Sequence, residues 1–184
     1  VAIIASQRTG SKQVRNLRCF RNVAGELNIN ASNGYPPYYF KIDSQSVYSP
    51  SNKLINLKAT NLSRYTIKDS KGCLYSDTFS LSEPDSMAIQ TIKIEDLKCF
   101  NDNTGKIEVA ATGGIAPYLY QWDKSTSDSF LADKLSSGQH IVTVIDDSLC
   151  RATKSFILKE PMPITILDSL IKPNPCYGDS LGKI

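Results

Sequence analysis

The chain has 184 residues, enough for two small domains, and its 41% hydrophobic and 21% charged residues are typical of a folded globular protein. Its 21 basic residues are interspersed with 18 acidic ones, and the net charge of only +3 argues against a nucleic-acid-binding surface. No apolar run approaches the roughly 20 residues that a membrane-spanning helix needs, so no membrane span is expected.

An internal repeat organises the sequence. Residues 17–20 (Leu-Arg-Cys-Phe) return at an offset of 80 as residues 97–100 (Leu-Lys-Cys-Phe), and the match continues along the chain. Further on, the offset becomes 77, so the second copy lacks three residues. The matched pairs include Gly25 with Gly105, Pro37 with Pro117, Asp43 with Asp123, Asp69 with Asp146, and Glu83-Pro84 with Glu160-Pro161.

The repeat predicts the domain organisation. Residues 1–12 are expected to be the end of a preceding repeat or a linker, residues 13–85 form repeat 1, and residues 86–162 form repeat 2. The offset of 77 also carries Cys99 to Cys176, which predicts that residues 163–184 are the start of a truncated third repeat.

Repeat 2 shows the strand pattern of one repeat most clearly. Residues 106–112 alternate apolar and polar side chains, as in a half-buried strand, after a turn in which Gly105 is expected to supply a positive φ. Short strands separated by turns, without a helical period, predict an all-β chain of tandem β-sandwich repeats of about 77 to 80 residues. Further strands are expected at 92–97, 118–122, 130–131, 141–145 and 152–158.

The aromatic residues fall into two groups. Tyr118, Tyr120 and Trp122 lie at alternate positions of one strand, which predicts that their rings share a face in the core. Three tyrosines of repeat 1 lie off the corresponding core phase and are the candidates for an exposed ligand-contact patch. These candidates are Tyr35, Tyr39 and Tyr48.

Five cysteines, with one histidine and no Cys-x-x-Cys pair, favour disulfides over a zinc site. Each complete repeat has one cysteine before its second strand and one near its end, so we predict the disulfides Cys19–Cys73 and Cys99–Cys150. Each would close a loop of about 50 residues and stabilise the fold by roughly 3 to 4 kcal/mol on the loop-entropy model. Cys176 would be unpaired by truncation. Buried free thiols in a cytosolic protein are the alternative.

These motifs resemble a known repeat family. Cys99 is followed by Gly105, an alternating strand, Gly113-Gly114 and Pro-Tyr-x-Tyr-x-Trp ending at Trp122; the copy closes with Val-x-Val-x-Asp, Cys150 and Glu-Pro. This pattern is similar to the SprB-type repeat of very large surface adhesins in gliding and related Bacteroidota. The resemblance covers nearly the whole chain. Repeat 1 is the more divergent copy, with Ile42 where the family usually has Trp and Arg64 in the place of Gly138.

The resemblance implies Ig-like sandwiches, export by a dedicated secretion system, and display outside the outer membrane at the cell surface as part of a filament or stalk. The expected partners are neighbouring repeats of the same chain, and surface glycans or other cell-surface proteins. No nucleic acid partner is expected.

Few residues in the sequence suggest catalysis or metal binding. His140 has no counterpart in repeat 1, so a surface or turn position is expected for it. Asn101 to Gly105 is weakly similar to a calcium loop, but the matching loop of repeat 1 has no carboxylate. The recurring aspartates are expected to cap turns rather than to form a hydrolase pair. We therefore predict no catalytic residue, no metal site and no cofactor.

Three functional hypotheses follow. The first is a stiff, disulfide-stapled stalk segment of a secreted cell-surface adhesin that serves surface adhesion or gliding motility, and not an enzyme. The second is a weak, multivalent glycan- or surface-binding module. The third makes the repeats accessory domains of a secreted enzyme whose catalytic part lies elsewhere.

Overall fold

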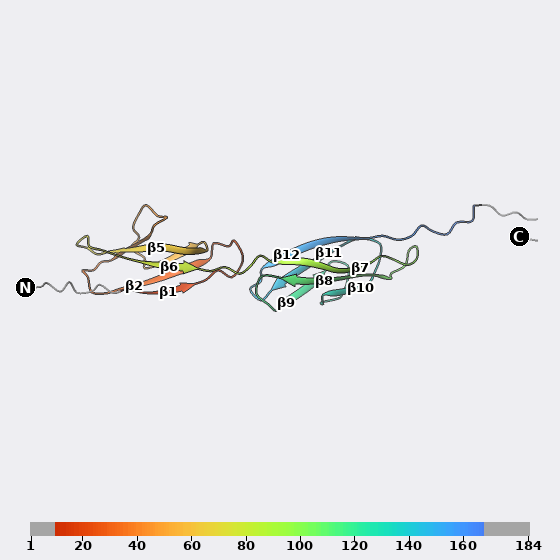
Figure 1. Cartoon of the computed structure of the whole chain (residues 1–184), viewed down its shortest axis with the longest axis horizontal. Helices are drawn as coiled ribbons and strands as arrows, with labels where there is room; N and C mark the ends of the chain where they lie inside the picture. Colours follow the sequence, from red (N-terminus) through yellow and green to blue (C-terminus); the bar gives the residue numbers. More distant parts are fainter. Residues whose placement is uncertain (1–9, 168–184) are drawn as a thin grey trace, which may run out of the picture.

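The structure, a computed structural model, describes residues 10–167 as strands, turns and loops, without a helix in that range. Its twelve strands form four three-stranded antiparallel sheets. Two sheets pack together in each repeat, so the chain is a tandem of two Ig-like β-sandwiches (Figure 1). The predicted all-β fold class is confirmed.

The first sandwich contains strands β1 to β6. One sheet has the order β1-β2-β4 and the other the order β3-β5-β6. β1 begins inside the range 1–12 that the sequence assigned to a preceding repeat or a linker, and it pairs with β2 along its whole length. The strands are β1 (Gly10–Arg15), β2 (Gly25–Ala31), β3 (Tyr39–Ile42), β4 (Lys53–Leu57), β5 (Thr60–Lys68) and β6 (Leu74–Leu81).

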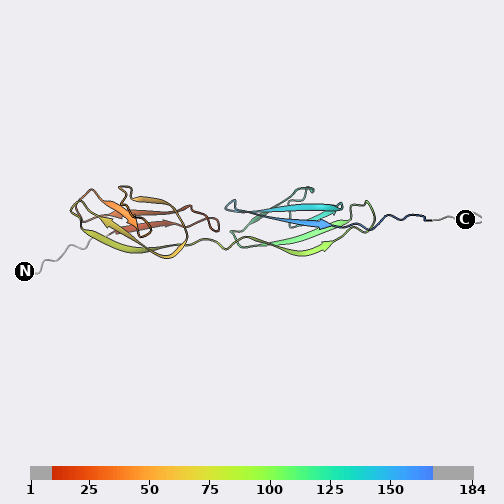
Figure 2. The ribbon, with the colours of Figure 1, turned by 90° about the horizontal axis from the view of Figure 1, so that it is seen from above.

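The second sandwich repeats this topology with strands β7 to β12. Its sheets have the orders β10-β8-β7 and β12-β11-β9. The strands are β7 (Ala88–Glu95), β8 (Gly105–Thr112), β9 (Tyr118–Trp122), β10 (Leu131–Leu135), β11 (Gly138–Asp146) and β12 (Arg151–Leu158). The two sandwiches follow one another end to end along the long axis of the molecule, joined by the chain between β6 and β7 (Figures 1 and 2).

Each sandwich has its own apolar core. In β8, Ile107 and Val109 are buried while Lys106 is exposed, as the alternation predicted. Trp122 is buried, and Tyr118 and Tyr120 pack against the same core, so the predicted aromatic face is confirmed.

Lys12 and Asp77 connect the two sheets of the first sandwich. The Lys12 ammonium donates a hydrogen bond to Asp77 Oδ2 at 2.8 Å and another to the carbonyl of Thr78. In the second sandwich, Lys154 occupies the place of Asp77 and donates instead to the carbonyl of Ile89 at 2.9 Å. The two copies therefore connect their sheets with different polar groups.

Gly105 does not have the positive φ expected from the sequence. It is the first residue of β8, and a side chain there would lie 2.8 Å from the carbonyl oxygen of Leu135 and 2.6 Å from Leu158 Cδ1. Glycine is needed for this close approach of strands. The positive φ of the preceding turn is at Asn101, at 55°.

The three residues missing from repeat 2 are lost at two places. The loop between β9 and β10 is two residues shorter than the loop between β3 and β4, which carries Tyr48. The third residue is lost within β5. This strand has a bulge between Thr60 and Ser63, where it pairs with β6, whereas the matching pair of β11 and β12 has no bulge and so needs one residue fewer.

Candidate functional site: the junction between the repeats

The two cysteines of each repeat lie at opposite ends of its sandwich. Cys73 directly precedes β6, whereas the Cys19 loop lies beside the end of β6. There the Leu17 N–H donates to the carbonyl of Ser82 at 3.0 Å, and the Arg21 N–H donates to Glu83 Oε2 at 2.6 Å.

The predicted disulfides within each repeat are therefore wrong. β6 has 8 residues, and a strand rises by about 3.3 Å per residue, so roughly 25 Å separates Cys73 from the Cys19 loop. A disulfide requires Cα atoms about 4.4 to 6.8 Å apart. The same distance argument applies to Cys99 and Cys150, because β12 also has 8 residues.

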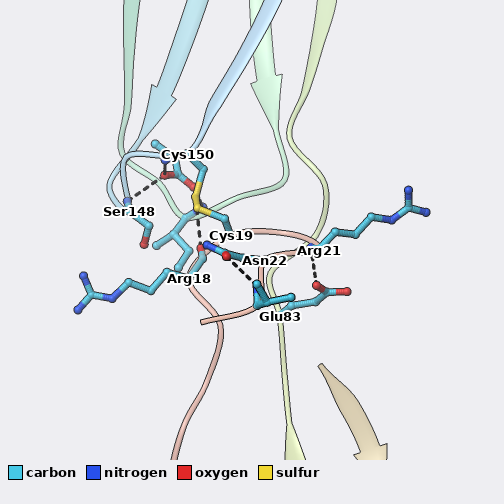
Figure 3. Close-up of a disulfide and its surroundings, with 10 residues drawn as sticks. Arg18, Cys19, Arg21, Asn22, Glu83, Ser148 and Cys150 are labelled. Atoms are coloured by element: carbon cyan, nitrogen blue, oxygen red, sulfur yellow. Dashed lines mark hydrogen bonds between the residues drawn. A yellow bond between two sulfur atoms is a disulfide. The ribbon is translucent and has the colours of Figure 1, made fainter. Parts of the chain in front are cut away.

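The structure instead joins Cys19 of repeat 1 to Cys150 of repeat 2, with 5.8 Å between their Cα atoms (Figure 3). Cys73 is half-buried and Cys99 is exposed, and both are free thiols. Cys176 lies outside the described residues. The disulfide is thus a link between successive repeats and not a staple inside one of them.

Glu83 holds the loop that carries Cys19. Its carboxylate accepts a hydrogen bond from the Arg21 N–H. Arg21 has a φ of 54°, a backbone conformation that residues other than glycine rarely adopt. The Cys150 Sγ lies 3.4 Å from the carbonyl of Arg18 in the same loop (Figure 3). The Glu-Pro that closes the repeat therefore also positions a cysteine, a role that the sequence analysis did not assign to it.

Asp146 organises the hairpin that carries Cys150. Its Oδ1 accepts hydrogen bonds from the N–H groups of Ser148 and Cys150, both at 2.9 Å, and its Oδ2 accepts one from Ile115 at 2.9 Å. Asp146 is only 3% exposed. The expectation that this recurring aspartate caps a turn is confirmed, as it is for Asp69, whose Oδ1 accepts from the N–H groups of Lys71 and Cys73.

The chain between the sandwiches packs on the second one. The Gly114 N–H donates to the carbonyl of Asp85 at 2.8 Å, and a side chain at Gly113 would lie 2.1 Å from the carbonyl oxygen of Ser86. The absence of side chains at Gly113 and Gly114 therefore lets the linker backbone pack closely against this turn. A hollow at this junction is lined by Cys19, Phe20, Pro84, Met87, Gly114 and Cys150.

The three candidate tyrosines lie away from this junction. Tyr39 is the cross-strand partner of Lys68, whose Nζ lies 5.7 Å from the centre of the Tyr48 ring, so these residues share the outer face of the sheet. Tyr48 also faces Lys41 Nζ at 4.9 Å. Tyr35 is 60% exposed and lies at the hairpin of Cys73, where its carbonyl accepts a hydrogen bond from the Ser70 N–H.

His140 is buried, so a surface position, one of the two expected for it, is wrong, whereas its contact with the turn at Ser136 agrees with the other. Only 1% of the residue is exposed, because it points into the sandwich at the start of β11. Its Nε2 lies 2.8 Å from the carbonyl of Ser136, and a carbonyl only accepts, so Nε2 carries the proton. The ring therefore ties a turn to the core.

The loop of residues 101–105, which is weakly similar to a calcium loop, hydrogen-bonds its carboxylate to neighbouring residues. Asp102 accepts hydrogen bonds from the Cys99 N–H at 3.0 Å and from the N–H and hydroxyl groups of Thr104. No group of three or more His, Cys, Asp or Glu side chains suited to a metal ion occurs among residues 10–167.

Comparison with known families gives a match in repeat 2. Residues 91–127 match the family model of the SprB repeat, a stretch that covers most of β7, all of β8 and β9, and part of the loop that follows. No curated protein matches the chain, and no helix able to span a membrane occurs in the described part of the structure. The family match suggests a cell-surface repeat of the adhesin type and an extracellular location. The chain contains a SprB-type repeat, as its motifs predicted.

Proposed function

We propose that these repeats form a stiff structural segment of a large secreted cell-surface adhesin that serves surface adhesion or gliding motility. The observation that carries the proposal is the Cys19–Cys150 disulfide between successive sandwiches. Two domains joined by one linker can hinge about it. The disulfide is a second covalent connection between the sandwiches, beside the linker residues that line the same hollow, and it restricts that hinge.

The disulfide also changes how the chain carries tension. Cys19 and Cys150 are 131 residues apart in sequence, and β2 to β11 all lie between them. A pull on the two ends of the chain passes through the S–S bond and bypasses these strands. A segment built in this way keeps its length under load even if one of its small cores opens.

We assign no catalytic step to the repeats. The recurring carboxylates of Asp69 and Asp146 are engaged by backbone N–H groups of their own hairpins. The histidine, His140, is buried and donates to a backbone carbonyl. These groups support the fold, which favours a structural role.

Single-molecule force spectroscopy on the full chain tests the proposal. Reduction of the disulfide frees 131 residues, so the fully stretched chain is expected to lengthen by roughly 430 to 470 Å. Cys150→Ser is expected to reproduce the reduced length under oxidising conditions, while Cys99→Ser leaves the oxidised length unchanged. Equal stretched lengths for the oxidised and reduced chains would rule out the proposed load path.

A second candidate function is supported by the outer face of the β3-β5-β6 sheet. Tyr39, Tyr48 and Lys68 gather there, and a partly exposed ring beside an ammonium group is a surface on which a sugar can stack and hydrogen-bond. Binding of the oxidised chain to a glycan and surface panel, lost in the Tyr35/Tyr39/Tyr48 alanine variant, would make the repeats an adhesive module. Absence of binding even after multimerisation would leave the stalk.

A further inference from the structure

The loop of Cys99 in repeat 2 is built like the disulfide-bonded loop of Cys19. The Leu97 N–H donates to the carbonyl of Lys159 at 3.0 Å, as Leu17 does to Ser82. The Asn101 N–H donates to Glu160 Oε2 at 2.8 Å, as Arg21 does to Glu83. Asn101 and Arg21 also share their positive φ, at 55° and 54°. The free Cys99 thiol is therefore presented in the same way as the bonded sulfur of Cys19.

The hairpin of Cys73 in repeat 1 is likewise built like that of Cys150. The Cys73 N–H donates to Asp69 Oδ1 at 2.9 Å, the distance found between Cys150 and Asp146. The Ser70 N–H donates to the carbonyl of Tyr35 at 2.9 Å, as Asp147 does to Ile115. Each repeat thus carries a cysteine loop at one end and a cysteine hairpin at the other, the two elements that form the junction.

The apolar residues that follow repeat 2 correspond to those of the linker that follows repeat 1. Met87 and Ile89 pack against the core of the sandwich that follows them. Ile164 and Ile166 occupy the same positions after repeat 2 and are 101% and 86% exposed. These residues lack the cover that a following sandwich provides inside the chain.

We infer that Cys73 and Cys99 are half-sites of the same inter-repeat disulfide, each taking as partner another repeat of this type in line along the polypeptide. Cys99 bonds to the hairpin cysteine of a repeat that follows, and Cys73 bonds to the loop cysteine of a repeat that precedes. The disulfides then form a continuous, staggered series in which the first cysteine of each repeat meets the second cysteine of the next. The inference rests on the observed junction and extends the proposed stalk.

Formation of each bond requires a disulfide oxidant such as glutathione disulfide. One protein thiolate attacks the oxidant, forms a mixed disulfide and releases one thiolate. The second protein thiolate then attacks the mixed disulfide, forms the Cys–Cys bond and releases the second. Two protein thiols are oxidised, and one small-molecule disulfide is reduced to two thiols.

The inference also separates the candidate tyrosines. Tyr35 lies at the Cys73 hairpin, so a preceding repeat would lie beside it, as repeat 1 lies beside the Cys150 hairpin that Ile115 contacts. Tyr39 and Tyr48 remain on the side of the sandwich, where further repeats leave them accessible.

A four-repeat tandem tests the inference. Joining residues 1–166 directly to residues 10–184 keeps the repeat register across the new junction and retains every described strand of both copies. The tandem carries Cys73→Ser in the first copy, and Cys99→Ser and Cys176→Ser in the second. After oxidation with glutathione disulfide, tryptic mapping is expected to find residues 99–106 linked to residues 72–93 within the monomer, with loss of both free thiols.

The matched control has the same composition. It carries Cys99→Ser in the first copy and Cys73→Ser with Cys176→Ser in the second, so its remaining thiols lie at opposite ends of the tandem and are expected to stay free. The Cys19–Cys150 disulfides report in the same digest that the repeats have assembled. If they form and the middle pair stays reduced, or bonds only between molecules, the inference is overturned while the proposed function stands. If Cys19–Cys150 itself fails to form, the proposed function fails as well.

Discussion

Asp146 accepts a hydrogen bond from the backbone N–H of Cys150 at 2.9 Å, so a buried carboxylate fixes the position of the cysteine that joins the two repeats. The carboxylate belongs to β11 and holds the hairpin through three N–H groups. The hairpin that presents Cys150 is therefore positioned by the fold of repeat 2.

Asp146→Ala should destabilise repeat 2 by about 2 to 4 kcal/mol, because it leaves three backbone N–H groups without their acceptor. Asp146→Asn keeps one acceptor oxygen and should cost less. Urea unfolding of the reduced chain measures both, free of any contribution from the disulfide. The exposed neighbour Asp147, changed to alanine, is the control, and a loss for Asp146→Ala no larger than for Asp147→Ala would contradict the assigned role.

Leu149→Gly should stabilise repeat 2 by about 0.5 to 1 kcal/mol. Leu149 has a φ of 65° in the place where repeat 1 has Gly72, and the left-handed conformation costs a leucine about 1 to 2 kcal/mol. Glycine removes this strain but adds about 0.5 to 1 kcal/mol of chain entropy to the unfolded state. Thermal unfolding measures the difference. Leu149→Ala keeps the strain and should change little; equal effects of the two variants would show that the backbone is not the cause.

Glu83→Ala should make the Cys19–Cys150 disulfide easier to reduce, by roughly fivefold in its equilibrium with glutathione. The change removes the acceptor of the Arg21 N–H, worth about 1 kcal/mol, and so loosens the loop that presents Cys19. Glu160→Ala is the matched control, because its loop carries the unpaired Cys99. An effect of the same size from Glu160→Ala would mean that local positioning of the cysteine is not involved.

Asp77→Asn should flatten the acid dependence of stability. The hydrogen bond from Lys12 holds the pKa of Asp77 below its ordinary value. A carboxyl whose pKa is lower in the folded state contributes stability above its unfolded pKa of about 3.9, and this is lost as the pH falls through the folded value. The effect should be small, since the Asp77 side chain is 38% exposed.

Urea midpoints at about pH 6 and about pH 3 provide the measurement for Asp77. The wild-type chain should lose more stability between the two than the Asp77→Asn variant does. Asp133→Asn, at an exposed position of β10, should behave like the wild type. A pH dependence that is the same in all three chains would contradict a contribution from Asp77.

The fold class could be predicted from the sequence because alternation of apolar and polar residues indicates a strand with one buried face. Alternation in residues 106–112 and the spacing of Tyr118, Tyr120 and Trp122 both indicate one buried face, and the structure buries that face. The recurring Asp69 and Asp146 also behaved as expected, because aspartate before a tight hairpin commonly caps backbone N–H groups.

The cysteine pairing could not be derived in the same way. One cysteine at each end of a repeat fits pairing within a repeat and staggered pairing between repeats equally well. The two pairings are distinguished by β6, an 8-residue strand between Cys73 and Glu83, the residue that holds the Cys19 loop. This strand is too long for a disulfide inside the repeat to span. The close strand approach at Gly105 and the burial of His140 were not predicted for a related reason, because both depend on neighbours distant in sequence.

Disulfide mapping of the oxidised full chain tests the central claim most directly. Trypsin places the cysteines on separate peptides, residues 19–21, 72–93, 99–106, 135–151 and 160–183, so each pairing gives a distinct linked mass without reduction. The junction predicts residues 19–21 linked to residues 135–151, with Cys73 and Cys99 recovered as thiols from the monomer. Residues 19–21 linked to 72–93, together with 99–106 linked to 135–151, would show staples within each repeat and contradict the account.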